Sequence, residues 1–143
     1  MQLKDFYYAD KHAVGSKMPI LLPSGDDSGE WLQVRGPDCD ESIKAARAYA
    51  AAVRAIDASL EELYEACKAK DDFTEWSEQR SYELEDLNRQ LAADLVIGWS
   101  FDTDGVPTPF TKEALSELLR QYRGLAPQVA KHHFDSRDAL NAK

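Results

Sequence analysis

The sequence predicts a mainly α-helical chain, in which a short N-terminal β-hairpin is followed by about four helices in one compact domain, residues 1–143. Residues 1–38 hold four of the seven glycines and three of the six prolines, which is typical of extended and turn structure. Apolar residues then recur at helical spacing through most of residues 39–143. A chain of this length is long enough to bury a hydrophobic core.

Two strands are predicted in the N-terminal segment, at residues 17–22 and 30–35. The turn-rich stretch at residues 23–29 separates them. The second strand alternates, with Leu32 and Val34 on one face and polar or aromatic residues on the other. Because a lone hairpin is marginal in water, we expect it to pack on helices, pair with another strand or join a neighbouring subunit.

The first long helix is predicted over residues 39–69. Asp38 is a good N-cap after Gly36-Pro37, and Glu41 lies three residues further on, as in a capping box. Apolar residues spaced by three or four form one stripe: Ile43, Ala46, Ala50, Val53, Ile56, Leu60, Leu63 and Cys67. The alanine-rich first half permits close helix contact, and we favour an intramolecular packing face over a dimer seam.

A second helix is predicted over residues 74–98, after a break at 68–72. One of its faces carries four leucines: Leu84, Leu87, Leu91 and Leu95. A turn follows, in which Asp104-Gly105 tolerates positive φ.

A third helix is predicted over residues 112–122. Thr111 caps it, and Gly124 ends it. The last helix, about 126–140, begins with Pro127 in its first turn and carries apolar residues that include Phe134.

Composition excludes several classes of function. The net charge of −9 and the pI of about 4.8 disfavour a nucleic-acid partner, because an acidic surface repels phosphates. No apolar run approaches the length of a membrane span, and the first residues lack the apolar core of a signal peptide. Cys39 and Cys67 are expected to be reduced thiols. We therefore expect a chain that stays in the cytoplasm.

Motifs for catalysis or for cofactors are missing from the sequence. His132 and His133 point about 100° apart on a helix, so they do not suit one metal ion, and His12 is expected in a flexible segment. Asp102-Thr-Asp-Gly105 does not continue as a calcium loop, because Thr111 stands where the glutamate is needed. We predict no enzymatic activity, no metal and no cofactor.

The most informative stretch joins the second and third predicted helices. It reads Gly98-Trp99, then Asp102-x-Asp-Gly-x-Pro-x-Pro-Phe-Thr111, then Leu118-Leu119. Over about residues 91–134, this pattern resembles the tail assembly chaperones of long-tailed bacteriophages with non-contractile tails. In that family a similar glycine–tryptophan loop leads into a Leu-Leu helix near the C-terminus.

The resemblance implies a chaperone that binds the phage tape-measure protein, keeps it soluble and helps to recruit tail tube subunits. It also implies self-association into a homo-oligomer, a longer form made by a −1 ribosomal frameshift, and a place in the host cytoplasm but not in the mature virion. Five residues are candidate partner contacts: Trp99, Phe101, Phe110, Leu118 and Leu119. For Trp99 we favour a plug at the end of the helix pair over a partner contact, and we expect Phe101 to be the more exposed of the aromatic residues.

Two other functions stay open. One is a structural head–tail connector or tail terminator, which would be found in finished particles. The other is a small inhibitor that binds a host protein.

Overall fold

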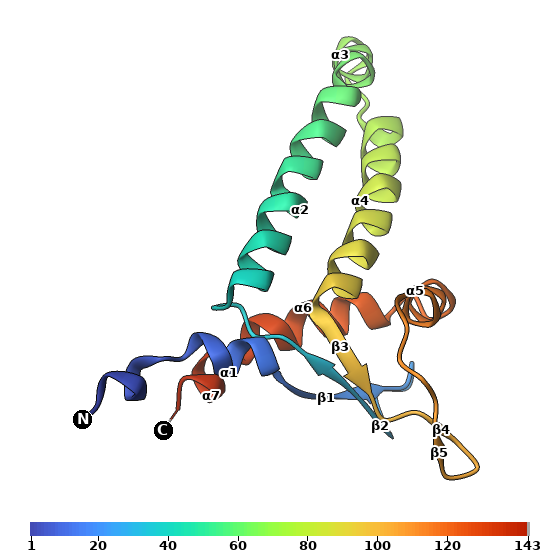
Figure 1. Cartoon of the computed structure of the whole chain (residues 1–143). Coiled ribbons are helices and arrows are strands. Elements are labelled where there is room, and N and C mark those ends of the chain that lie inside the picture. Colours follow the sequence, from blue (N-terminus) through green and yellow to red (C-terminus); the bar gives the residue numbers. More distant parts are fainter. Residues whose placement is uncertain (143) are drawn as a thin grey trace.

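The computed structural model describes residues 1–142 and consists of a sheet-and-helix base from which a long helical arm projects (Figure 1). The arm contains α2 (Asp40–Ser59), α3 (Glu61–Lys70) and α4 (Thr74–Leu95). The base contains η1 (Leu3–Phe6), α1 (Ala9–Val14), β1 (Ser16–Leu21), β2 (Asp27–Val34), β3 (Val96–Trp99), α5 (Lys112–Gln121), α6 (Leu125–Asp135) and α7 (Arg137–Leu140). A small hairpin, β4 (Asp102–Thr103) and β5 (Val106–Pro107), precedes α5. The prediction of a mainly helical chain with an N-terminal hairpin is confirmed.

The hairpin belongs to a three-stranded antiparallel sheet in the order β1-β2-β3. Its strands lie at Ser16–Leu21 and Asp27–Val34, so the predicted 17–22 and 30–35 were shifted by up to three residues. β3 pairs with β2 through Leu32↔Trp99 and Val34↔Val96, and α6 packs on β1 and β2. The hairpin is therefore stabilised both by another strand and by a helix.

Strand β3 corrects the prediction of a single helix over 74–98. The helix ends at Leu95, and Val96 is already extended, with φ −89° and ψ 131°. The β-branched pair Val96-Ile97 and the helix-weakening Gly98 favour this change. Pairing with β2 also buries Val96 to 1% exposure, which a continued helix would not do.

The core lies between the inner face of the sheet and helices α4, α5 and α6. Leu32 and Val34 are fully buried, as the alternation in the second strand predicts. The other large members are Met18, Ile20, Leu95, Val96, Leu115, Leu119, Leu125 and Val129.

The long helix predicted over 39–69 is two helices, which meet at Leu60. The predicted break at 68–72 is confirmed, because Asp71 adopts a left-handed conformation with φ 53°. The packing face of α2 also differs from the predicted stripe, since Ile43 is 42% exposed while Ala45 is buried. Contact with α4 selects this face, which turns the smaller side chain inward.

Of the two predicted N-terminal caps, the cap of α5 is confirmed and the cap of α2 is wrong. Thr111 accepts a hydrogen bond from the backbone N–H of Ala114 and begins α5, as predicted. The predicted capping box at α2 is wrong, because its N-cap is Cys39 and makes no side-chain cap bond. Asp38 instead forms an ion pair with Arg137, 3.2 Å away.

The C-terminus of α4 is held by groups from two other elements. The backbone N–H of Arg35 donates to the carbonyl of Leu95 at 2.9 Å, and its Nη1 donates to the carbonyl of Asp94 at 3.1 Å. The Nζ of Lys112 donates to the carbonyl of Ala93 at 2.9 Å. These bonds satisfy carbonyls that have no partner within the helix and place positive charge at the negative end of its dipole.

The end of edge strand β1 is bound by side chains. The backbone N–H of Leu21 donates to Oε1 of Gln128 at 2.9 Å, and its carbonyl accepts from Nε2 of Gln128 at 3.0 Å. The hydroxyl of Tyr122 donates to the same carbonyl.

Gly15 and Gly25 provide a matched test of the packing between α1 and the sheet. Both have positive φ, +73° and +93°, but a Cβ at Gly15 would lie 2.0 Å from the carbonyl oxygen of Val34, whereas a Cβ at Gly25 meets nothing within 4 Å. We expect Gly15→Ala to lower the free energy of unfolding by about 2–3 kcal/mol more than Gly25→Ala. Denaturant unfolding of both variants measures the difference, and equal losses would contradict the close approach.

Candidate functional site

The three aromatic residues of the loop that follows β3 contact one another. The ring of Trp99 meets Phe101 and Phe110 edge-to-face, with centroids 5.3 and 5.1 Å apart. All three are half-buried and pack against the core. The sequence prediction grouped these residues, and the structure brings them together as a brace between β3 and α5.

Backbone bonds fix the shape of the same loop. The indole Nε1 of Trp99 donates to the carbonyl of Thr108 at 2.8 Å, and the N–H of Thr108 donates to the carbonyl of Phe101 at 2.9 Å. Asp104 and Gly105 have φ of 51° and 82°, so the predicted turn closes the hairpin of β4 and β5. The loop is thus ordered before any partner binds.

The two candidate leucines, Leu118 and Leu119, lie in α5, which follows the braced loop. Leu119 is 1% exposed in the core, whereas Leu118 is half-buried and packs against the core from outside. A partner therefore reaches Leu118 more readily than Leu119. Their role as partner contacts stays a prediction.

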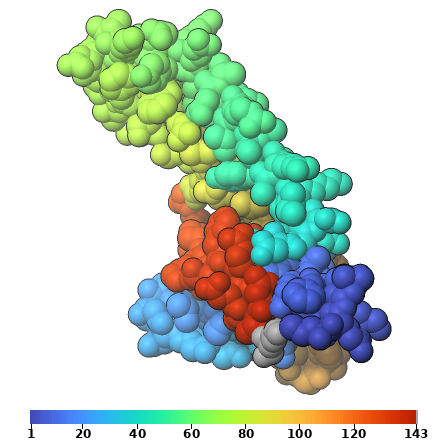
Figure 2. Space-filling view, turned by 90° about the vertical axis from the view of Figure 1, so that its left-hand side faces the viewer, coloured from blue at the N-terminus to red at the C-terminus, as the bar shows by residue number. Residues whose placement is uncertain are grey.

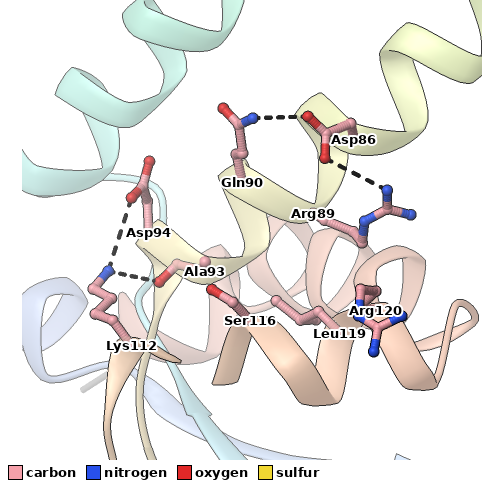
Figure 3. Close-up of a pocket in the computed structure, with 9 residues that line it drawn as sticks. All are labelled: Asp86, Arg89, Gln90, Ala93, Asp94, Lys112, Ser116, Leu119 and Arg120. Carbon is pink, nitrogen blue, oxygen red and sulfur yellow. Dashed lines mark hydrogen bonds and ion pairs between the residues drawn. The ribbon is translucent and has the colours of Figure 1, made fainter. Parts of the chain in front are cut away.

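A polar groove of about 450 Å³ runs between α4 and α5 (Figure 3). Its cations are already paired: Arg89 with Glu85 and Asp86, Arg120 with Glu117, and Lys112 with Asp94. Leu119 contributes apolar surface and Ser116 a hydroxyl. Since the positive charges are neutralised, the groove does not have the character of an anion site.

A second groove is apolar and lies where the arm meets the base. It consists of a pocket of about 170 Å³ between α4 and α6 and a neighbouring pocket of about 90 Å³ between α2 and α4, and Leu91 lines both. Six alanines contribute to the two walls: Ala45, Ala48, Ala52, Ala92, Ala126 and Ala130. We call these two pockets together the alanine groove.

The alanine groove suits a helical ligand. Short side chains allow two helices to approach closely, and an amphipathic helix can place its apolar face in such a groove. An apolar cavity of about 150 Å³ is large enough to hold benzene, so the larger pocket can accept one bulky side chain. The hydroxyl of Tyr49, which lines the smaller pocket, donates to Oδ1 of Asn88, which lines the larger one, at 2.7 Å and links α2 to α4.

The local sequence pattern does not predict this groove. The alanine-rich stretch of α2 pointed to close helix contact, which was the available signal. The contribution of Ala126 and Ala130 depends on α6 crossing beneath the arm, an arrangement that the local pattern does not contain.

The histidine side chains form hydrogen bonds to neighbouring elements. His12 is 0% exposed, accepts the N–H of Asp38 at Nδ1 and donates from Nε2 to Asn141, so its expected place in a flexible segment is wrong. His133 is buried and donates from Nδ1 to the carbonyl of Arg35. Phe134, predicted among the apolar residues of the last helix, is 63% exposed, whereas His133 beside it is 5% exposed.

Residues 1–142 contain no group of three or more metal-binding side chains. Cys39 and Cys67 are free and buried. Over the same residues, no helix combines the length and apolar character needed to span a membrane.

Comparisons with protein-family models, with curated proteins and with solved structures find no match to this chain.

Burial of His132 and His133 makes the free energy of unfolding depend on pH near neutrality. Desolvation lowers the pKa of His132 and His133 below the ordinary value of 6.5. As the pH falls below 6.5, these histidines take up protons in the unfolded chain before they do so in the folded one. Their contribution to the free energy of unfolding is therefore present above pH 6.5 and is lost on acidification. We expect the unfolding temperature to fall between about pH 7.5 and pH 5.5.

The double variant His132→Gln, His133→Asn isolates this effect. We expect it to reduce the fall in unfolding temperature over that range, because both residues no longer titrate. Calorimetry of both proteins at matched ionic strength makes the comparison, and an unchanged slope would refute the assignment.

Proposed function

We propose that this chain is a tail assembly chaperone of a bacteriophage with a long non-contractile tail. It binds the tape-measure protein, keeps it soluble in the host cytoplasm, and helps to recruit tail tube subunits before it leaves the growing tail. The resemblance of the Trp99 loop supports the family. The observation that carries the proposal is the alanine groove, whose larger pocket has uncharged, mainly apolar walls and is large enough for one bulky side chain of a client helix.

The mechanism follows from the chemistry of a long helical client. A tape-measure protein exposes apolar stripes until the tail forms around it, and such stripes aggregate in water. Docking a stripe in the groove removes apolar surface from water, which contributes about 25 cal/mol for each Å². Association itself opposes this gain, so we expect a single groove to bind weakly.

Several copies together would bind more strongly than one. Self-association places many grooves along one client, and each bound groove raises the effective concentration of the next. The net charge of −9 keeps such a complex soluble. The proposal gives the chain a binding role and assigns it no reaction or cofactor.

Filling the groove tests the proposal. Ala130 lines the larger pocket and is half-buried, so we expect Ala130→Leu to occupy the space of the client side chain. Co-expression with the tape-measure protein should then give about tenfold less soluble complex, equivalent to about 1.4 kcal/mol of binding free energy. The readout is the amount of client that co-purifies with the tagged chain.

Ala50→Leu is the matched control, because Ala50 is exposed on α2 and does not line either pocket. It should leave the yield of complex unchanged. Equal yields for both variants would exclude the groove as the client site. A wild-type chain that captures no tape-measure protein, or that is present in finished particles, would reject the chaperone function itself.

A further inference from the structure

The net charge of the chain is concentrated on the distal part of the arm. Residues 57–86 hold eleven Asp and Glu against three Lys and Arg, a net charge of −8, whereas the whole chain carries −9. The rest of the molecule is therefore close to neutral. Figure 2 shows this part of the arm, in green and yellow-green, extending away from the base.

Aromatic side chains gather at the far end of the same region. Tyr64 contacts Phe73 and Trp76, with both pairs of ring centroids 5.3 Å apart, and Phe73 also contacts Trp76. Tyr64 and Phe73 remain 38% and 36% exposed. We call these three residues the arm tip. Large aromatic surfaces that water still reaches are typical of the centres of protein interfaces.

Contacts between helices position the arm tip. Asp57 and Arg80 form an ion pair of 2.8 Å that links α2 to α4, and the guanidinium of Arg80 lies 5.9 Å from the centre of the Trp76 ring. Leu60, where α2 meets α3, and Cys67 on α3 are buried. The partner thus meets aromatic surface that is already ordered.

Negative charge without a counterion accompanies the aromatic surface. Five exposed glutamates of α3 and early α4 form no ion pair within the described residues: Glu61, Glu62, Glu65, Glu75 and Glu78. Cationic side chains of a partner can therefore pair with these carboxylates. The carboxylates near the groove between α4 and α5 are instead already paired with cations of the chain itself. Complementary charge of this kind speeds association and selects partners.

From this juxtaposition we propose that the arm tip docks a basic amphipathic segment of a partner protein, with apolar side chains on the rings and lysines or arginines on the surrounding glutamates. A second copy of this chain is a poorer occupant, because two arms of charge −8 repel each other and the base is nearly neutral. Since an α-helix rises about 1.5 Å per residue, the tip at Trp76 lies about 22 Å along α4 from Leu91 of the alanine groove. The two surfaces act independently, and this inference does not rest on the chaperone function.

A defined peptide tests the proposal with the full chain. The probe is a fluorescein-labelled peptide of about 20 residues, built of leucine and lysine at helical spacing. We expect it to bind, to shift the backbone amide resonances of Tyr64, Phe73 and Trp76, and to bind more weakly as salt rises from about 50 to about 300 mM. Shifts confined to the base would overturn the proposal.

Charge reversal provides the decisive variant. Glu61, Glu65 and Glu75 are exposed, so replacing all three by lysine is expected to preserve the fold and to weaken peptide binding about tenfold. The control reverses three exposed acids of the base, Asp102, Glu113 and Asp138, for the same change in net charge. An equal loss in the control would show a general charge effect and would reject a site at the tip.

Two further peptides separate the contributions of charge and apolar surface. A leucine–glutamate peptide should not bind. Oligolysine should bind more weakly than the leucine–lysine peptide, because it pairs with the glutamates but covers no aromatic surface. Equal binding by either peptide would overturn the proposed partner chemistry. Concentration-dependent dimerisation that is lost in the tip variant would assign the surface to a second copy instead, and would likewise refute the proposal.

Discussion

The C-terminus of α4 is the junction on which the arrangement of the molecule depends. The arm is joined to the sheet at both of its ends. Residues 35–39 lead from β2 into α2, and α4 passes directly into β3 at Val96. Arg35 from the end of β2 and Lys112 from the start of α5 bind the last carbonyls of α4. Two elements that are far apart in sequence, β2 and α5, are therefore positioned against one helix end, and the Trp99 brace fixes the loop between β3 and α5.

Much of the local structure could be predicted because the responsible signals are local. Alternation identified the inner face of β2, Asp104-Gly105 identified a turn, and Thr111 identified the start of α5. What failed depends on distant partners. Val96 becomes a strand residue because β2 is beside it, and His12 is ordered because Asp38 and Asn141 bind it. The aromatic residues of the candidate site were grouped correctly, whereas the alanine groove requires α6 to cross under α2 and α4.

The two proposed surfaces differ in the physical basis of recognition. The larger pocket of the alanine groove has no charged lining residue and offers apolar area, so a ligand there is held mainly by burial. The arm tip combines a modest aromatic area with strong negative potential, so a ligand there depends on ionic strength. Placing them at opposite ends of α4 lets one chain contact two segments of a partner, or two partners, at a separation set by the length of a helix.

The bonds of Gln128 to Leu21 have a consequence for how copies of the chain can meet. The amide of Gln128 occupies the donor and the acceptor that the strand would otherwise present to another strand, and Pro19 two residues earlier has no N–H to offer. An exposed strand edge can pair with a strand of another molecule, and repeated pairing of this kind leads to aggregation. At Leu21 and Pro19 that edge is blocked, so β1 does not offer a continuous row of backbone donors and acceptors to a strand of another copy.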